Sequence, residues 1–244
     1  MKRLILYLSF FIFSITAVRA QIILGALSAG INLTQVDGDE VYGFHKVGFN
    51  GGPSAIIPFA KRWSVSIETL FSQKGSYQKP QYDDSLSYEY KLNLNYVEVP
   101  LLVHFEDKRI VCVGAGVSWS RLVGVKEWEH GRRVETTTLD GPYNRNDFSV
   151  VADVRIPIYH RLKIQARYSY TFATIRKRSF TDGSGNTWTR KQYNNVITFR
   201  LVYIFNEKIL KKKEKTDNKP VNKGHNTRSI ILPFFNFCLL GMIM

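Results

Sequence analysis

The sequence predicts an all-β fold, an eight-stranded antiparallel up-and-down transmembrane β-barrel with long extracellular loops and short periplasmic turns. Eight stretches between residues 23 and 205 alternate apolar with polar side chains, and the segments that join them are alternately long and short. A period of two is typical of β-strands, and this alternation of loop lengths is typical of closed barrels in an outer membrane. We therefore expect an outer-membrane location.

The alternation is clearest in the seventh stretch. Its apolar face carries Leu162, Ile164, Ala166, Tyr168, Tyr170 and Phe172. Its polar face carries Lys163, Gln165, Arg167, Ser169 and Thr171. Comparable patterns predict eight strands over residues 26–33, 47–59, 63–73, 92–105, 110–121, 148–156, 162–172 and 193–205. A tilted strand needs about 9–11 residues to cross a bilayer, and most of these stretches are long enough.

The lengths of the joints predict the orientation of the barrel. Short joints are expected at residues 60–62, 106–108 and 158–161, and long ones at 34–45, 75–90, 122–146 and 173–192. Periplasmic turns are short and external loops are long in such barrels, so both ends of the barrel region should face the periplasm.

Aromatic side chains gather near both expected rims, as they do at the two interfaces of a membrane. The expected inner girdle is Phe59, Trp63, Phe105, Tyr159, Tyr203 and Phe205. The expected outer girdle is Phe49, Phe71, Trp119, Phe148, Tyr170, Phe172 and Tyr193.

The chain divides into three expected segments. Residues 1–20 resemble a secretory signal peptide, with Lys2 and Arg3 before an apolar run and small residues at Val18 and Ala20. Residues 21–205 form the barrel. Residues 206–244 form a basic periplasmic tail that is expected to be disordered and that ends in an apolar stretch.

Composition excludes some classes of function. The formal net charge is +14, but the basic residues are spread along the chain and the aromatic residues share the apolar face of the strands. A nucleic-acid surface would need both on one face, so we expect no nucleic-acid partner. The mean hydropathy of −0.17 would also suit a soluble protein. Outer-membrane barrels have similar values, because half of each strand is polar.

The inward faces of the predicted strands carry charged side chains of both signs. The expected lumen charge network is Glu68, Glu98, Asp153, Arg155, Lys163, Arg167 and Arg200. The interior of an eight-stranded barrel is only wide enough for side chains to fill. These charges should therefore pair across the lumen and leave no wide aqueous pore.

Several motifs resemble those of the PorT-like outer-membrane β-barrel family. The sequence Ser72-Gln73-Lys74-Gly75 and the segment 96–102, Tyr-Val-Glu-Val-Pro-Leu-Leu, are the specific ones, and the resemblance covers residues 21–205. It implies a barrel in the outer membrane of a Gram-negative cell. Because one member of that family serves the type IX secretion machinery, it also implies secretion-machinery or other envelope proteins as candidate partners.

The sequence offers little for enzymatic chemistry. It lacks His-Glu-x-x-His, Gly-x-Ser-x-Gly and a phosphate-binding glycine loop, so we expect no catalytic residues, no cofactor and no metal. The sequence leaves two alternatives: His45 and Ser72 near one rim as part of a lipid-active site, and residues 37–40 (Asp-Gly-Asp-Glu) as a divalent-cation loop. The latter pattern is more often a solvated hairpin tip, because a complete calcium site needs 6–8 oxygens.

The external loops should carry any specific binding. The fourth is basic, and we expect Arg176, Lys177 and Arg178 to contact lipopolysaccharide phosphates or, equally, to form a solvated turn. The expected function is a non-enzymatic barrel of structural, binding or secretion-accessory type. The alternatives left open are a small lipid-active outer-membrane enzyme and a soluble periplasmic carrier barrel.

Overall fold

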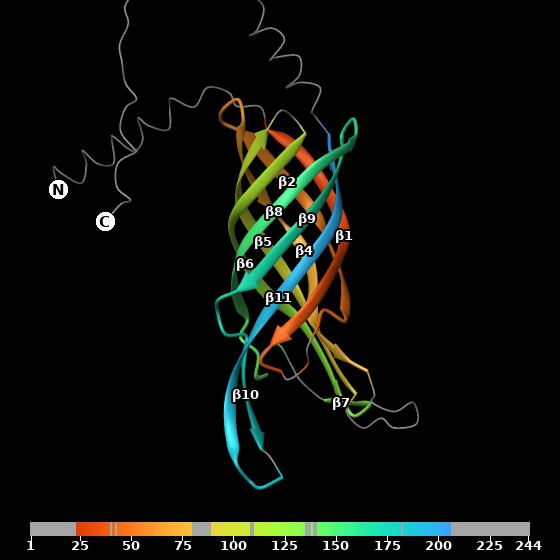
Figure 1. The fold of residues 1–244 in the computed structure, drawn as a ribbon, viewed down its shortest axis with the longest axis vertical. Coiled ribbons are helices and arrows are strands. Elements are labelled where there is room, and N and C mark those ends of the chain that lie inside the picture. The colour runs from red at the N-terminus through yellow and green to blue at the C-terminus, as the bar shows by residue number, and fades with distance from the viewer. Residues whose placement is uncertain are drawn as a thin grey trace, which may run out of the picture.

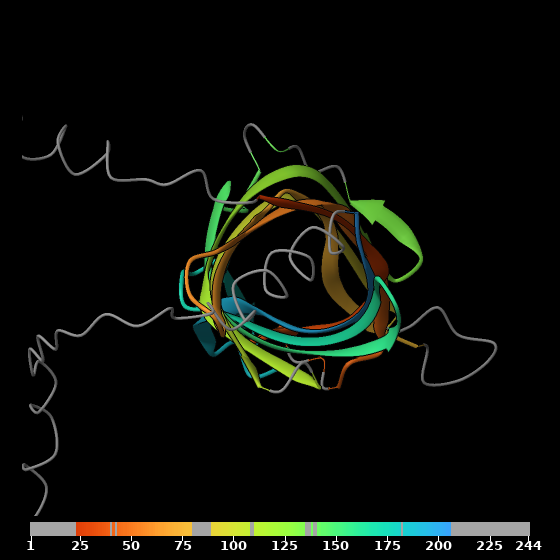
Figure 2. The same cartoon turned by 90° about the horizontal axis from the view of Figure 1, so that it is seen from above.

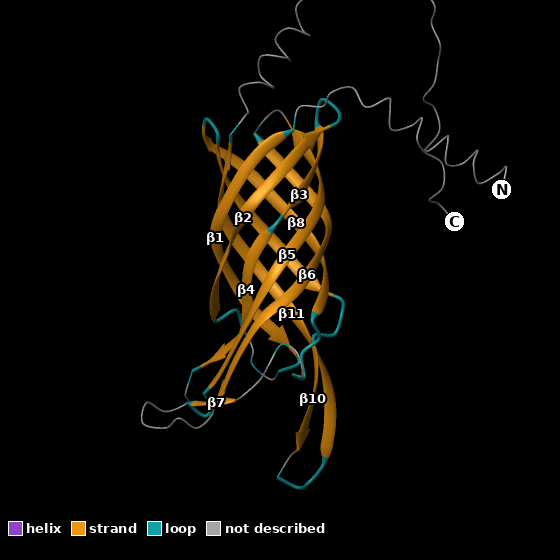
Figure 3. Ribbon diagram, turned by 180° about the vertical axis from the view of Figure 1, so that it is seen from behind, coloured by secondary structure: helices purple, strands orange, loops and turns teal. Residues whose placement is uncertain are grey.

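A computed structural model describes residues 23–39, 41, 43–79, 89–107, 110–134, 138, 141–181 and 183–205. The predicted signal peptide (1–20) and tail (206–244) lie outside these residues. The described part consists of strands and connecting loops (Figure 3), and none of it forms a helix long and apolar enough to cross a membrane. The strands are β1 Leu24–Asp37, β2 Lys46–Pro58, β3 Trp63–Glu68, β4 Leu70–Gln78, β5 Tyr90–Asp107, β6 Val111–Glu129, β7 Arg132–Val134, β8 Asn146–Tyr159, β9 Leu162–Thr171, β10 Arg176–Thr181 and β11 Thr187–Ile204.

Eight strand positions close into a barrel, which confirms the predicted fold class. The order around the ring is β1, β2, β3 with β4, β5, β6, β8, β9 and β11, and β11 pairs again with β1. Every pairing is antiparallel, and Figure 2 shows the closed ring in a view along the barrel. Closure matters because an open sheet edge in lipid would leave backbone groups without hydrogen bonds.

The predicted third strand (63–73) is one position of the ring but two strands. β3 pairs with β5 through Ile67 and Leu101, and β4 pairs with β5 through Leu70 and Glu98, so the break lies opposite Val99 and Pro100. On the other side of the break, the N–H of Thr69 donates to the carbonyl of Pro53 at 2.9 Å. Proline has no N–H to donate. Pro53 of β2 and Pro100 of β5, on the two sides of the break, therefore each offer the sheet one hydrogen-bond donor fewer.

The side chains sort by face as the alternation predicts. Tyr168 and Phe199 point outward and are 46% and 44% exposed, whereas Arg167 and Arg200 point inward and are each 3% exposed. Outward aromatic residues mark both rims, with Trp63 paired to Phe105 at one end and Trp119 paired to Phe148 at the other. The outer surface between the rims is therefore a band of apolar side chains that suits lipid.

The predicted bounds of the long loops are wrong, because the strands continue beyond the membrane. β4 continues to Gln78 and β6 to Glu129, within ranges expected to be loops (75–90 and 122–146), and a β10–β11 hairpin replaces most of 173–192. β7 adds to the end of β6. Figure 1 shows β7 and the β10–β11 hairpin at one end of the barrel, opposite the short turns. We call this end the extracellular extension.

The apolar side chains of β5 change from the outer face to the inner face where the strand leaves the membrane. Within the barrel, Val97 points outward and Glu98 inward, whereas farther out Lys91 and Asn93 point outward and Leu92 inward. A register shift between Asn95 and Tyr96 accompanies the change. The reason is that lipid surrounds the barrel but water surrounds the extension, so the apolar side chains move from the outer face to the inner one.

Candidate functional site

A group of ion pairs occupies the middle of the lumen, with Glu68 at its centre. Glu68 is the last residue of β3, and the alternation of that strand points its carboxylate inward among three arginines. It accepts hydrogen bonds from Arg155 of β8 at 3.0 Å, Arg167 of β9 at 2.9 Å and Arg200 of β11 at 2.6 Å. All four side chains are buried. Charge-assisted bonds of this kind are roughly twice as strong as neutral ones.

Asp153 is the second anion of this group. Its carboxylate accepts from Arg167 at 2.9 Å and lies 3.1 Å from Nε2 of His104, and Gln165 donates to it as well. Gly114 lies beside Asp153 on the sheet, and any side chain there would overlap His104 and Asp153. The glycine therefore leaves the space that this hydrogen-bonded pair fills.

A second polar group lies next to the first, toward the extracellular end. Lys74 of β4 forms ion pairs with Glu98 of β5 at 3.3 Å and with Asp147 of β8 at 3.4 Å. Ser118 donates to Glu98 at 3.1 Å, and Asn194 donates to Asp147 at 3.0 Å. These residues come from five different strands, so the group links opposite walls of the barrel.

The structure brings together five of the seven lumen residues that the sequence singled out: Glu68, Asp153, Arg155, Arg167 and Arg200. Glu98 belongs to the neighbouring group with Lys74. Lys163 lies at the periplasmic end, where it pairs with the partly exposed Glu106 at 3.3 Å.

Sequence reasoning missed Lys74, His104 and Asp147. The alternation could have identified two of them. His104 lies an even number of residues from the inward Glu98, and Asp147 lies two residues before the inward Ser149. Lys74 was missed because a loop was expected to begin at Gly75, whereas β4 continues to Gln78.

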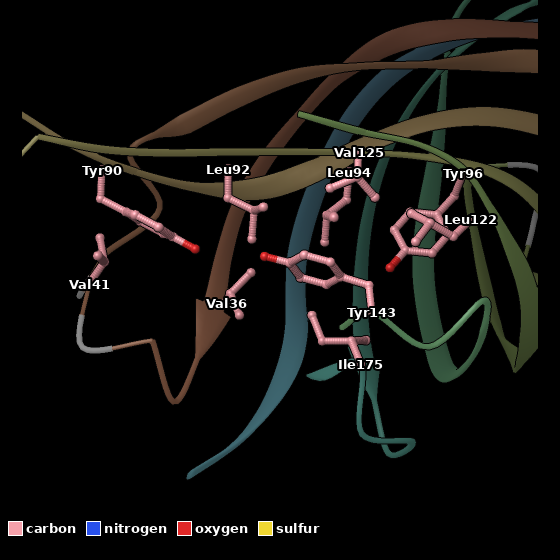
Figure 4. Close-up of a cluster of buried hydrophobic side chains, with 10 residues drawn as sticks. All are labelled: Val36, Val41, Tyr90, Leu92, Leu94, Tyr96, Leu122, Val125, Tyr143 and Ile175. Atoms are coloured by element: carbon pink, nitrogen blue, oxygen red, sulfur yellow. The ribbon is translucent and has the colours of Figure 1, made fainter. Parts of the chain in front are cut away.

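Buried apolar clusters lie on both sides of the polar groups along the barrel. The periplasmic cluster is Leu24, Ala26, Ile56, Val202 and Ile204. The extracellular cluster, drawn in Figure 4, is Val36, Val41, Tyr90, Leu92, Leu94, Tyr96, Leu122, Val125, Tyr143 and Ile175. Figure 4 shows Tyr90, Leu92, Val36 and Tyr143 pointing toward one another across the interior. The described interior is thus apolar, then ionic, then apolar along its length.

Ion pairs dock the β10–β11 hairpin on β6 above this cluster. Arg176 donates to Glu127 at 2.8 Å and to the hydroxyl of Tyr143 at 2.6 Å, and Arg178 donates to Glu129 at 2.7 Å. Burial raises the pKa of Tyr143, so its hydroxyl keeps its proton. Two of the three residues expected to contact lipopolysaccharide are therefore bonded within the extension.

Lys177 lies on the opposite face of the hairpin, where it is exposed. It pairs across the hairpin with Lys191, which is also exposed.

The sequence matches the family described as outer membrane protein beta-barrel domain over residues 23–176, which is more than half of the chain. The chain belongs to this family. It is accordingly an outer-membrane barrel, and this location excludes the soluble periplasmic carrier that the sequence left open. No curated protein matches it in sequence.

Several solved outer-membrane barrels are similar to this one in structure. Ail, the attachment invasion locus protein of Yersinia pestis, is 14% identical with a TM-score of 0.43, over 75% of this chain and 98% of that one. Neisserial surface protein A is 13% identical with a TM-score of 0.40, over 75% and 96%. OprG of Pseudomonas aeruginosa is 13% identical with a TM-score of 0.37, over 76% and 95%.

The acidic loop of this outer-membrane barrel does not gather cation ligands among its described residues. Asp37 accepts from the side chain of Gln35 at 2.7 Å, and Asp39 is buried and accepts from the N–H of Val41 at 2.9 Å. Glu40 lies outside the described residues. Within the described ranges there is no group of three His, Cys, Asp or Glu side chains that could hold a metal ion. Burial raises the pKa of Asp39 to about 6.

The structure does not bring together His45 and Ser72, the candidate residues for a lipid-active site. Ser72 is buried in the lumen, where its hydroxyl accepts from Asn32 at 3.0 Å. His45 is exposed just before β2, at the extracellular end of the barrel. A nucleophile buried in the lumen and a histidine exposed outside it are not within hydrogen-bond reach of each other.

Proposed function

We propose that this outer-membrane barrel is non-enzymatic and non-conducting, and that it holds an extracellular β-structure in place for binding a partner at the cell surface. The observation that carries the proposal is the filled interior. Two ion-paired groups cross the described lumen, and a buried apolar cluster lies on each side of them. A hydrated ion would have to separate bonds such as that between Arg200 and Glu68 to pass.

The docked hairpin supports a binding role rather than a purely structural one. A barrel that only filled space in the membrane would not need strands beyond it, yet β10 and β11 continue as a hairpin that two ion pairs to β6 hold in place. Thr187 and Thr189 are exposed on this hairpin, and Phe180 stacks with Trp188 across it at 6.2 Å between ring centroids. Binding residues are commonly found on such segments, which a rigid scaffold positions.

The described charged residues in the lumen support the non-enzymatic part of the proposal. Glu68, Glu98, Asp147 and Asp153 each have a cationic partner within 4 Å. A general acid or base must be free to exchange a proton with a substrate. Carboxylates held in buried ion pairs behind apolar clusters do not meet that requirement.

An accessory role in protein secretion is the narrower form of this proposal. It is supported by the resemblance of residues 72–75 and 96–102 to motifs of the PorT-like family. Deleting the gene and measuring secreted cargo tests it: unchanged secretion in the deletion strain would leave the surface-binding role and remove the secretion role.

Conductance tests the closed lumen. The mature chain, without the predicted signal peptide (residues 1–20), is refolded into planar bilayers. Its insertion is checked by heat-modifiable migration of the same sample. We expect no stable ionic current, with a general porin as the positive control. Stable unitary currents from the correctly folded chain would overturn the non-conducting part of the proposal.

Cross-linking in intact envelopes tests the binding part. A photo-crosslinking residue at Thr189, exposed on the hairpin, is compared with one at Lys61, exposed in the periplasmic turn between β2 and β3. We expect a discrete protein adduct from position 189 that is absent from position 61. No adduct at 189 in cells that express the folded barrel at their surface would contradict a surface-binding role.

A further inference from the structure

Above the outer aromatic girdle, β6 separates its charges by face. From Trp119 outward, Arg121, Lys126 and Trp128 point away from the barrel axis, whereas Glu127 and Glu129 point toward it. Both glutamates are bonded to arginines of β10. The outward face is therefore left cationic, and the negative charge is neutralised within the extension.

Neighbouring strands add to this outward face. Lys91 of β5 lies opposite Trp128, and its ammonium sits over the indole ring at 5.4 Å from the centroid. Arg133 of β7 lies opposite Trp128 on the other side and is exposed. We call Lys91, Arg121, Lys126 and Arg133 the basic belt. On this outward face, the described residues from β4 to β8 above Trp119 include one acidic residue, Glu89, which directly precedes β5.

The belt begins at the level where the lipid ends. Arg121 lies two residues beyond Trp119, about 7 Å along the strand, and Trp119 pairs with the outer-girdle residue Phe148. Tryptophan and other aromatic residues lie at the headgroup level of a membrane. Arg121 is also fixed in place, because its Nη1 donates to the amide oxygen of Asn146 at 2.8 Å.

We propose that the basic belt binds the phosphate groups of lipopolysaccharide in the outer leaflet. The partner follows from position and charge together: phosphates are the anions at that depth, and arginine and lysine are the side chains that bind them. The belt faces sideways, toward neighbouring lipid, and Lys126 and Arg133 extend the cationic surface away from the membrane, where the anionic sugars of the core lie. This site is separate from the hairpin surface proposed above for a protein partner.

The belt replaces the site that the sequence favoured for the same ligand. Arg176 and Arg178 of β10 are directed at Glu127 and Glu129, so their charge is used within the extension. Lys177 points outward but belongs to a hairpin that projects away from the barrel wall (Figure 1). Arg121 of β6, in contrast, lies on the barrel wall itself, two residues beyond Trp119 of the girdle.

Lipopolysaccharide retention tests the proposal on the full mature chain. The double variant Arg121→Gln and Lys126→Gln is compared with a matched control, Lys177→Gln and Lys191→Gln, which removes two exposed charges from the hairpin instead. The readout is lipopolysaccharide per barrel after detergent extraction, with heat-modifiable migration as the check of folding. We expect about a fivefold weakening for each belt charge removed, and retention close to wild type in the hairpin variant.

Nanodiscs identify the chemical group that is bound. Binding of lipid A in nanodiscs is compared with binding of the same lipid after dephosphorylation, and we expect the belt variant to affect only the phosphorylated form. Lys126→Arg keeps the charge and should retain binding. Equal retention by the belt and hairpin variants, a greater loss in the hairpin variant, or equal binding of dephosphorylated lipid would each overturn the proposal.

Discussion

Arg200 and Glu68 are bonded across the lumen, with 2.6 Å between Nη2 and Oε2, although 132 positions separate them in the sequence. They belong to β11 and β3, which are not neighbours in the sheet. The bond therefore adds a link through the interior to the hydrogen-bonded wall. Because Glu68 also binds Arg155 and Arg167, one carboxylate joins four positions of the ring.

The first prediction concerns that carboxylate. Glu68→Gln keeps the size of the side chain but leaves three buried guanidinium groups with one anion fewer. Removing one partner of a buried ion pair costs about 3–5 kcal/mol, and we expect a loss of this size in the free energy of unfolding. Urea titration of the refolded barrel, followed by heat-modifiable migration, measures it. The matched control is Glu106→Gln, whose partly exposed pair with Lys163 should contribute less than about 1 kcal/mol.

The second prediction concerns Gly114, the inward glycine beside His104 and Asp153. A methyl group there would overlap the imidazole and the carboxylate, and neither can move far in the filled lumen. Gly114→Ala should therefore destabilise the barrel by about 1–3 kcal/mol. At Gly25, by contrast, the nearest atom to an added methyl group would be Cδ2 of Phe205 at 3.5 Å, an ordinary contact. Equal unfolding midpoints for Gly114→Ala and Gly25→Ala would show that the space beside His104 is not needed.

The third prediction concerns Asp39 in the first extracellular loop. Burial raises its pKa from 3.8 to about 6, so the folded loop binds this proton more tightly than the unfolded loop does. The stabilisation is complete below about pH 4 and is lost as the pH rises through 6; it amounts to at most about 3 kcal/mol. The protection factor of the Val41 amide, which donates to Asp39 at 2.9 Å, should accordingly be higher at pH 4 than at pH 7.

The variant Asp39→Asn serves as the test of cause. An asparagine keeps an oxygen for the Val41 N–H but does not titrate, so the protection of Val41 should no longer depend on pH. Asp37→Asn, which changes a partly exposed carboxylate two residues earlier, should leave the dependence intact. A Val41 amide equally protected at both pH values in the unmodified chain would contradict the prediction.

Much of the barrel could be predicted from the sequence because a membrane imposes a simple rule on a strand. Lipid on one side and packed polar groups on the other require strict alternation, and Tyr168 and Arg167 follow it as neighbours with opposite exposure. The same rule placed Glu68, Asp153 and Arg200 inward. Which of these charges pair could not be predicted, because pairing depends on strand tilt and on side-chain length across the lumen.

The extracellular extension could not be predicted by that rule, because the rule reverses there. Leu92 and Leu94 are apolar and point inward, while Lys91 and Asn93 are polar and point outward. A search for strands with apolar outer faces therefore ends too early on β6, which continues to Glu129, although the predicted strand 92–105 already included this part of β5. The same reversal hid the docking of Arg176 on Glu127, since both residues lay in segments expected to be loops.

The last prediction tests the lipid-facing surface itself. Val154 points outward from β8 between Phe148 of the outer girdle and Tyr159 of the inner one, and it is 40% exposed. An arginine near the bilayer midplane costs a transmembrane barrel about 2–4 kcal/mol. Val154→Arg should therefore reduce the free energy of unfolding of the barrel in bilayers by that amount. Thr189→Arg, exposed on the hairpin outside the membrane, should change this free energy by less than about 0.5 kcal/mol. If both arginines were tolerated equally well, the apolar outer face of β8 would not be in contact with lipid, and the barrel's orientation in the membrane would have to be assigned anew.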